Sequence, residues 1–78
     1  MAPGAEYTIQ LAAYTSRDEA VKLQAHLQTR GIATRVYGTS SPYRVRMGRY
    51  PTRAAADAEA QRLKAAKMDC FVTEAEAR

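Results

Sequence analysis

The stretch Tyr7-Thr-Ile-Gln-Leu-Ala-Ala-Tyr14 recurs 36 residues later as Tyr43-Arg-Val-Arg-Met-Gly-Arg-Tyr50. A tyrosine opens and closes both stretches, and between them Ile9 corresponds to Val45. The correspondence continues without a gap until residue 37 meets residue 73. Self-similarity at a fixed period is typical of repeated structural units. We therefore predict that the chain consists of two copies of one unit.

Each copy has the pattern of a strand, a helix and a second strand. Residues 7–14 alternate between apolar and polar side chains, as expected for a strand with one covered face. Ser16 and Glu19 have the spacing of a helix-capping box, which predicts a helix that runs to Arg30 and ends before Gly31. The other predicted elements are a strand over 32–37, a turn over 38–42, a strand over 43–47, a connection over 48–52, a helix over 53–66 and a strand over 68–73.

This βαββαβ order predicts an α+β sandwich of the ferredoxin or RNP type. The expected sheet has four antiparallel strands in the order 4-1-3-2, with both helices on one face. The 78 residues suffice for one core and no more. We expect a domain over 7–74, a linker over 1–6 and a tail over 75–78. The core-facing helix positions are Ala20, Leu23 and Leu27 in the first helix and Ala56, Ala60 and Leu63 in the second.

Positive charge is concentrated in the middle of the chain. The net charge is +4, and the segment from Arg30 to Arg53 contains six arginines and no acidic residue. Arginine favours planar, bidentate partners such as carboxylate or phosphate. No apolar run approaches the roughly 18 residues that span a bilayer, so we expect no direct membrane insertion of this segment. We also expect the domain to be a monomer.

The sequence offers little material for catalysis or metal binding. His26 is the only histidine and has no nucleophile at a diagnostic spacing, so we expect an exposed helix residue rather than a general base. Cys70 is the only cysteine, and we expect it to face the core rather than a metal. We therefore predict a non-catalytic domain without a cofactor or a metal site.

One face of the predicted sheet has no helix to cover it. By strand parity, this face presents a solvent-facing Gln10 in the middle, arginines beside it and aromatic rings toward the edges. Amide and guanidinium groups bind polar substituents, while aromatic faces stack on flat bodies, so this face suits an extended polymer. The residues that parity assigns to this binding surface are Gln10, Ala12, Tyr14, Arg35, Tyr37, Arg44, Arg46 and Phe71.

Two motifs resemble the signatures of the SPOR (sporulation-related repeat) domain family. Ile9-Gln-Leu-Ala-Ala-Tyr14 is similar to the family's first strand, usually a hydrophobic residue, Gln, hydrophobic, Gly, Ser and an aromatic residue. Tyr43-Arg-Val-Arg-Met-Gly-Arg-Tyr50 is similar to its second signature, Tyr-Arg-Val-x-Val-Gly-Pro-Phe. The resemblance covers residues 7–73, nearly the whole chain.

The resemblance implies a βαββαβ fold and a place in the periplasm or cell envelope, as a module of a larger exported protein. It also implies binding to septal peptidoglycan whose glycan strands have lost their stem peptides, which would target the parent protein to the division site. The family binds through the sheet face, and its Gln falls on Gln10. The family's Gly-Ser pair is Ala12-Ala13 here, so Ala13 joins the expected site without a hydroxyl, and the usual Pro is Arg49.

Removal of the stem peptide from N-acetylmuramic acid uncovers a lactyl carboxylate. An anionic polysaccharide of this kind suits a face with Arg35, Arg44 and Arg46. The same topology, with exposed aromatics and basic charge, also describes the RNA-recognition motif. Residues 43–50 lack that motif's glycine-aromatic-glycine order and its paired central aromatics. RNA binding therefore stays as the alternative.

Overall fold

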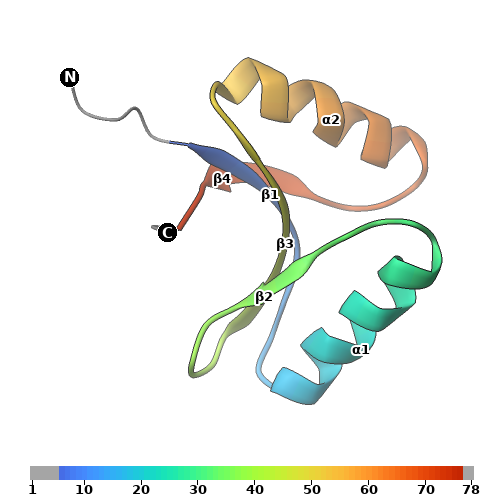
Figure 1. Cartoon of the computed structure of the whole chain (residues 1–78), viewed down its shortest axis with the longest axis vertical. Helices are drawn as coiled ribbons and strands as arrows, with labels where there is room; N and C mark the ends of the chain where they lie inside the picture. Colours follow the sequence, from blue (N-terminus) through green and yellow to red (C-terminus); the bar gives the residue numbers. More distant parts are fainter. Residues whose placement is uncertain (1–5, 77–78) are drawn as a thin grey trace.

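The structure is a computed structural model that describes residues 6–76. The chain forms alternating strands and helices in the order βαββαβ (Figure 1). The elements are β1 (Tyr7–Tyr14), α1 (Arg17–Thr29), β2 (Arg35–Tyr37), β3 (Tyr43–Tyr50), α2 (Arg53–Ala65) and β4 (Phe71–Glu74).

The four strands form one antiparallel sheet in the order β2-β3-β1-β4. This order is 4-1-3-2 read in reverse, so the predicted topology is confirmed. Both helices pack on one face of the sheet, α1 against β1, β2 and β3 and α2 against β1, β3 and β4. Within residues 6–76, no helix lies on the opposite face, which we call the open face.

The element bounds confirm the internal repeat. An offset of 36 residues carries the bounds of β1 onto those of β3 and the bounds of α1 onto those of α2. The two long strands, β1 and β3, lie side by side in the middle of the sheet (Figure 1). One pair of equivalent residues, Gln10 and Arg46, therefore lies directly opposite at the centre of the sheet.

The core consists of two apolar clusters between the sheet and the helices. Under α2, fully buried Ile9 packs with Ala60 and Leu63. Under α1, fully buried Val45 packs with Ala20 and Leu27. Leu11 and Met68 contact both clusters and join them. The predicted inward stripes of both helices are thus confirmed.

Both short strands begin later than the sequence predicts. Ile32 and Met68, the predicted first residues, instead close the helices that precede them, since their N–H groups donate to the carbonyls of Leu27 and Leu63, each at 2.9 Å. The residues just before them, Gly31 (φ 79°) and Lys67 (φ 66°), have the left-handed conformation that ends a helix. β2 therefore starts at Arg35 and β4 at Phe71.

The third strand is longer than predicted and continues to Tyr50 instead of ending at Met47. Gly48 does not end the strand, because it lies in a β-bulge: between the pairs Tyr7–Tyr50 and Ile9–Met47, one residue of β1 (Thr8) lies opposite two of β3 (Gly48 and Arg49). Within residues 6–76, no helix has the length and apolar character needed to cross a membrane.

Candidate functional site

A row of four side chains crosses the open face from edge to edge. Strand register places Arg35 of β2 opposite Arg46 of β3, Arg46 opposite Gln10 of β1, and Gln10 opposite Phe71 of β4. Directly paired residues share a face and lie about 5 Å apart. A second row consists of Tyr37, Arg44 and Ala13.

A second β-bulge decides which residues of β1 reach this face. Gln10 pairs with Arg46 but Ala12 pairs with Val45, so β1 contains one extra residue at this point. Ala12 and Tyr14 therefore turn to the helix side and pack against the Val45 cluster. Our prediction that these two residues share the face of Gln10 was wrong, because strand parity assumes a regular pleat. The same bulge leaves Ala13 exposed on the open face.

Gln10 is buried rather than solvent-facing, which corrects a further expectation. Only 7% of the residue is exposed, and its Oε1 accepts a hydrogen bond from Arg46 Nε at 3.1 Å. Arg46 is itself only 8% exposed, and its guanidinium carbon lies 5.0 Å from the centre of the Tyr37 ring. The centre of the open face is thus a fixed polar network.

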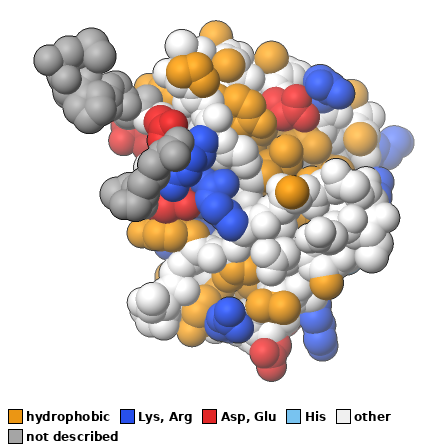
Figure 2. Space-filling view, in the orientation of Figure 1, with side chains coloured by type: hydrophobic (Ala, Val, Ile, Leu, Met, Phe, Trp, Pro, Cys, Tyr) orange, Lys and Arg blue, Asp and Glu red, His pale blue; other side chains and the backbone are white. Residues whose placement is uncertain are grey.

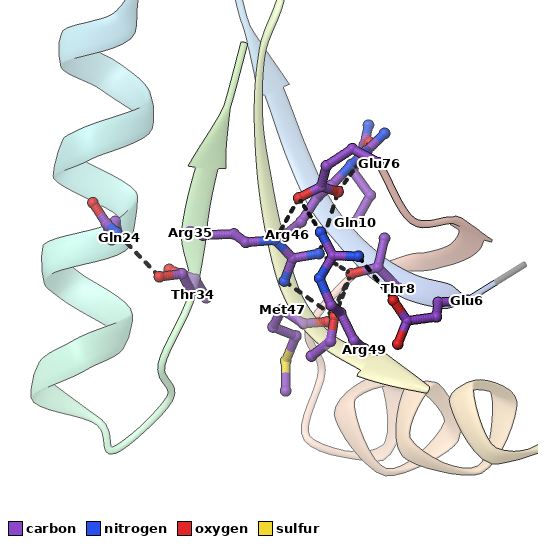
Figure 3. Close-up of polar contacts among 11 residues, drawn as sticks. Glu6, Thr8, Gln10, Gln24, Thr34, Arg35, Arg46, Met47, Arg49 and Glu76 are labelled. Atoms are coloured by element: carbon purple, nitrogen blue, oxygen red, sulfur yellow. Dashed lines mark hydrogen bonds and ion pairs between the residues drawn. The ribbon is translucent and has the colours of Figure 1, made fainter. Parts of the chain in front are cut away.

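Glu76 sits in the middle of this network and ion-pairs with three arginines (Figure 3). Its Oε2 lies 2.7 Å from Arg35 Nε and 3.3 Å from an Arg49 terminal nitrogen, and its Oε1 accepts from Arg46 at 2.9 Å. Arg49 also pairs with Glu6 at 3.2 Å. We call Arg35, Arg46 and Arg49 the arginine cluster. Figure 2 shows basic and acidic side chains in contact on this flank of the molecule.

The environment of Glu76 keeps its carboxylate ionised. Hydrogen bonds from Arg35, and secondarily from Arg46, lower the pKa of Glu76 to about 2, although burial opposes the shift. The Glu76 side chain is 8% exposed. A buried carboxylate is stable when it is paired and hydrogen-bonded, and here the arginine cluster provides both.

Glu76 reaches the arginine cluster because the chain extends the β1–β4 pairing beyond the end of β4. Beyond the pair Tyr7–Glu74, the Ala75 N–H donates to the Glu6 carbonyl at 2.8 Å, which directs the next residue across the open face. We predicted a tail over 75–78 and did not expect Glu76 to belong to the site. Strand parity carries no information beyond the end of a strand. The only sequence signal for Glu76 was its negative charge, in a chain whose basic segment contains no acid to pair with its arginines.

The rest of the open face is more accessible. Phe71 is 53% exposed and Tyr37 is 41% exposed. Beside Tyr37, the β2–β3 loop forms a shallow hollow of about 500 Å³ that Arg44 and the hydroxyl-bearing residues 39–41 line. Among the contacts of the described residues, Arg44 has no ion pair and no hydrogen bond from its side chain. An arginine, an aromatic ring and hydroxyl groups thus converge on one open concavity.

Neither reactive side chain of the sequence forms a catalytic arrangement. His26 is exposed on α1. Cys70 packs against the Ile9 cluster, as predicted, and burial raises the pKa of its thiol. In the part of the chain that the structure describes, no three His, Cys, Asp or Glu side chains group as metal ligands would.

Comparisons with known proteins agree with this geometry. A search of solved structures finds the solution structure of the peptidoglycan binding domain of the B. subtilis cell wall lytic enzyme CwlC, with a TM-score of 0.77 and 24% sequence identity. The alignment covers 97% of this chain and 96% of that one, and at this identity it shows a shared fold. A search of curated protein sequences finds no match. Residues 3–74 match the SPOR domain family, so this chain belongs to the SPOR domain family.

Proposed function

We propose that this domain binds peptidoglycan without catalysis, by holding glycan strands that lack stem peptides against its open face. The observation that carries the proposal is the row Arg35, Arg46, Gln10 and Phe71, which spans all four strands. A continuous row of polar and aromatic groups matches an extended polymer better than a compact metabolite. The solved peptidoglycan-binding domain of the same fold supports this ligand class.

The available groups fit a polysaccharide backbone. Among the described residues, none accepts a hydrogen bond from the Gln10 amide nitrogen, which can therefore donate to an acetamido carbonyl. Phe71 and Tyr37 present exposed rings on which the apolar face of a sugar can pack. The proposed site is Gln10, Ala13, Arg35, Tyr37, Arg44, Arg46 and Phe71.

Charge explains a preference for strands without peptides. The lactyl group of N-acetylmuramic acid is a free carboxylate when the stem peptide is gone and a neutral amide when the peptide is attached. No side chain within residues 6–76 pairs with Arg44, which is therefore available to such a carboxylate, and attached peptides would obstruct a flat sheet. The domain would thereby direct its parent protein to the division septum in the cell envelope.

RNA binding, the alternative, has less support. RNA-recognition motifs stack bases on aromatic residues of the central strands, whereas here the central pair presents Gln10 and Arg46. No feature of the open face favours a nucleic acid over a glycan.

A pulldown tests the proposal. Purified sacculi treated with an amidase, which removes stem peptides, should retain more of the domain than untreated sacculi, and single-stranded RNA should bind only weakly. Equal retention on both kinds of sacculi would contradict the selectivity. Tight RNA binding with no gain on treated sacculi would overturn the proposed function.

A further inference from the structure

We propose that the arginine cluster is a carboxylate-binding site that Glu76 occupies in the free domain, and that a carboxylate of the ligand displaces Glu76 on binding. The inference rests on the proposed function for the identity of the ligand. It goes further because it assigns the site, its present occupant and a competition between the two.

The geometry around Glu76 is that of a built anion site. Arg35 and Arg46 lie opposite each other on neighbouring strands, and one carboxylate bridges them at 2.7 and 2.9 Å. Arg49 adds a third contact at 3.3 Å. Charge-assisted hydrogen bonds of this kind are the strong ones. The bound carboxylate of Glu76 demonstrates the chemical class that the site accepts.

The arginines keep their positions by contacts that do not involve Glu76. Arg35 also donates to the Gly48 carbonyl at 3.0 Å and to the Thr8 hydroxyl at 2.9 Å. Arg46 is held by Gln10 at 3.1 Å and lies over the Tyr37 ring. The site therefore remains ordered when Glu76 leaves, and an incoming carboxylate finds two guanidinium groups already oriented.

Glu76 itself is attached to the rest of the fold much more weakly. It follows the end of β4, and within residues 6–76 the Ala75–Glu6 hydrogen bond is the last backbone bond of the sheet on that side. Neither apolar cluster includes a residue beyond Val72. Release of Glu76 thus breaks the ion pairs of the open face without opening the apolar core. A lactyl carboxylate on a glycan strand can replace those pairs one for one, whereas a peptide amide at the same place has no charge to offer.

The test compares Glu76→Gln with Glu74→Gln, which removes the same charge from an exposed residue of β4. The ligand is a soluble peptide-free glycan fragment, used both in its native form and with its lactyl carboxylates reduced to alcohols. We expect Glu76→Gln to raise affinity for the native glycan about 3- to 30-fold, since its competitor is weakened. Affinity for the reduced glycan should stay unchanged, and Glu74→Gln should change neither.

An unchanged or lower affinity of Glu76→Gln for the native glycan, with wild-type binding intact, would overturn the inference and leave the proposed function standing. In that case Arg44 receives the ligand's carboxylate while Glu76 stays in place. If the wild-type domain does not bind the native glycan at all, the proposed function itself is overturned.

A second measurement needs no glycan. Acetate at tens of millimolar, added to Glu76→Ala, should shift the NMR signal of the Arg35 Nε–H group, which donates to Glu76 in the wild type, toward its wild-type position. The wild type, whose site is filled, should respond much less at the same concentration. Equal responses of the two proteins would show that the cluster is no carboxylate site, whatever the glycan experiments give.

Discussion

Gln10 and Arg46 occupy the same position in the two repeats, 36 residues apart, and hydrogen-bond to each other across the central strand pair. The bond from Arg46 Nε to Gln10 Oε1 is 3.1 Å long, and both residues are less than a tenth exposed. The repeat thus brings an amide and a guanidinium together at the centre of the open face. The two equivalent positions carry complementary hydrogen-bonding groups.

Replacement of Gln10 by alanine should destabilise the domain. Gln10→Ala removes the partner of the buried Arg46 Nε–H, so we expect the free energy of unfolding to fall by about 1–2 kcal/mol. Urea unfolding measures this change. Gln10→Glu keeps an acceptor and should lose less stability. An unchanged midpoint for Gln10→Ala would mean that water replaces the amide without cost.

Stability should depend on the ionisation of Glu76. Because the folded state lowers the pKa of Glu76 from 4.5 to about 2, this carboxylate stabilises the fold fully above the unfolded value. The contribution is on the order of 2 kcal/mol and should disappear as the pH falls through that interval. Glu76→Gln should abolish this part of the pH dependence, as measured by urea unfolding at several pH values. Glu74→Gln should preserve it; a wild-type profile in Glu76→Gln would contradict the assignment.

Substitution of Gly48 by alanine should cost more stability than substitution of Gly31, although both glycines have positive φ. A Cβ at Gly48 would lie 2.7 Å from the Tyr50 ring, whereas nothing lies within 4 Å of one at Gly31. Gly31→Ala should therefore cost only the backbone strain, about 1 kcal/mol, and Gly48→Ala about 2–3 kcal/mol. Thermal unfolding of both variants separates the cost of backbone strain from the cost of the clash with Tyr50. Equal losses would show that Tyr50 moves aside freely.

Lys67 is the repeat equivalent of Gly31 and has φ 66° without being glycine. Lys67→Gly should raise the free energy of unfolding by about 0.5–1 kcal/mol, because glycine adopts this conformation without strain. Ala58→Gly, at an exposed position in the interior of α2, should lower stability by a similar amount. A loss of stability in Lys67→Gly would mean that the lysine side chain contributes a contact that outweighs the strain.

The repeat predicts much of this fold. The strand order, the helix face and both inward stripes follow from periodicity and connection rules alone. The offset also carries residues 7–14 onto 43–50, the observed extent of β3. We predicted a shorter strand with a connection that starts at Gly48, whereas this glycine lies in a bulge inside the strand. The repeat was a better guide here than the local propensity of one residue.

The site is less predictable because its details depend on irregularities and on contacts distant in sequence. The bulge after Gln10 moves Ala12 and Tyr14 off the open face, and no local sequence signal marks that extra residue. The ion pairs of Glu76 join β2 and β3 to a segment that follows the last strand. Parity and motif matching describe regular strands, so they could identify Gln10 and the arginines but not the acid that pairs with them.

The central claim, that glycan binds on the open face, is tested most directly by the affinity of single variants for a soluble peptide-free glycan. Arg44→Ala and Phe71→Ala change exposed or half-exposed side chains of the open face, and Lys22→Ala and Lys64→Ala remove charge from the exposed surfaces of the two helices. We predict that each open-face change weakens binding about tenfold, the equivalent of one lost charged or stacking contact, while each helix change alters it less than about twofold. Equal losses on both sides would mean diffuse attraction to an anionic polymer and would contradict a binding site on the sheet.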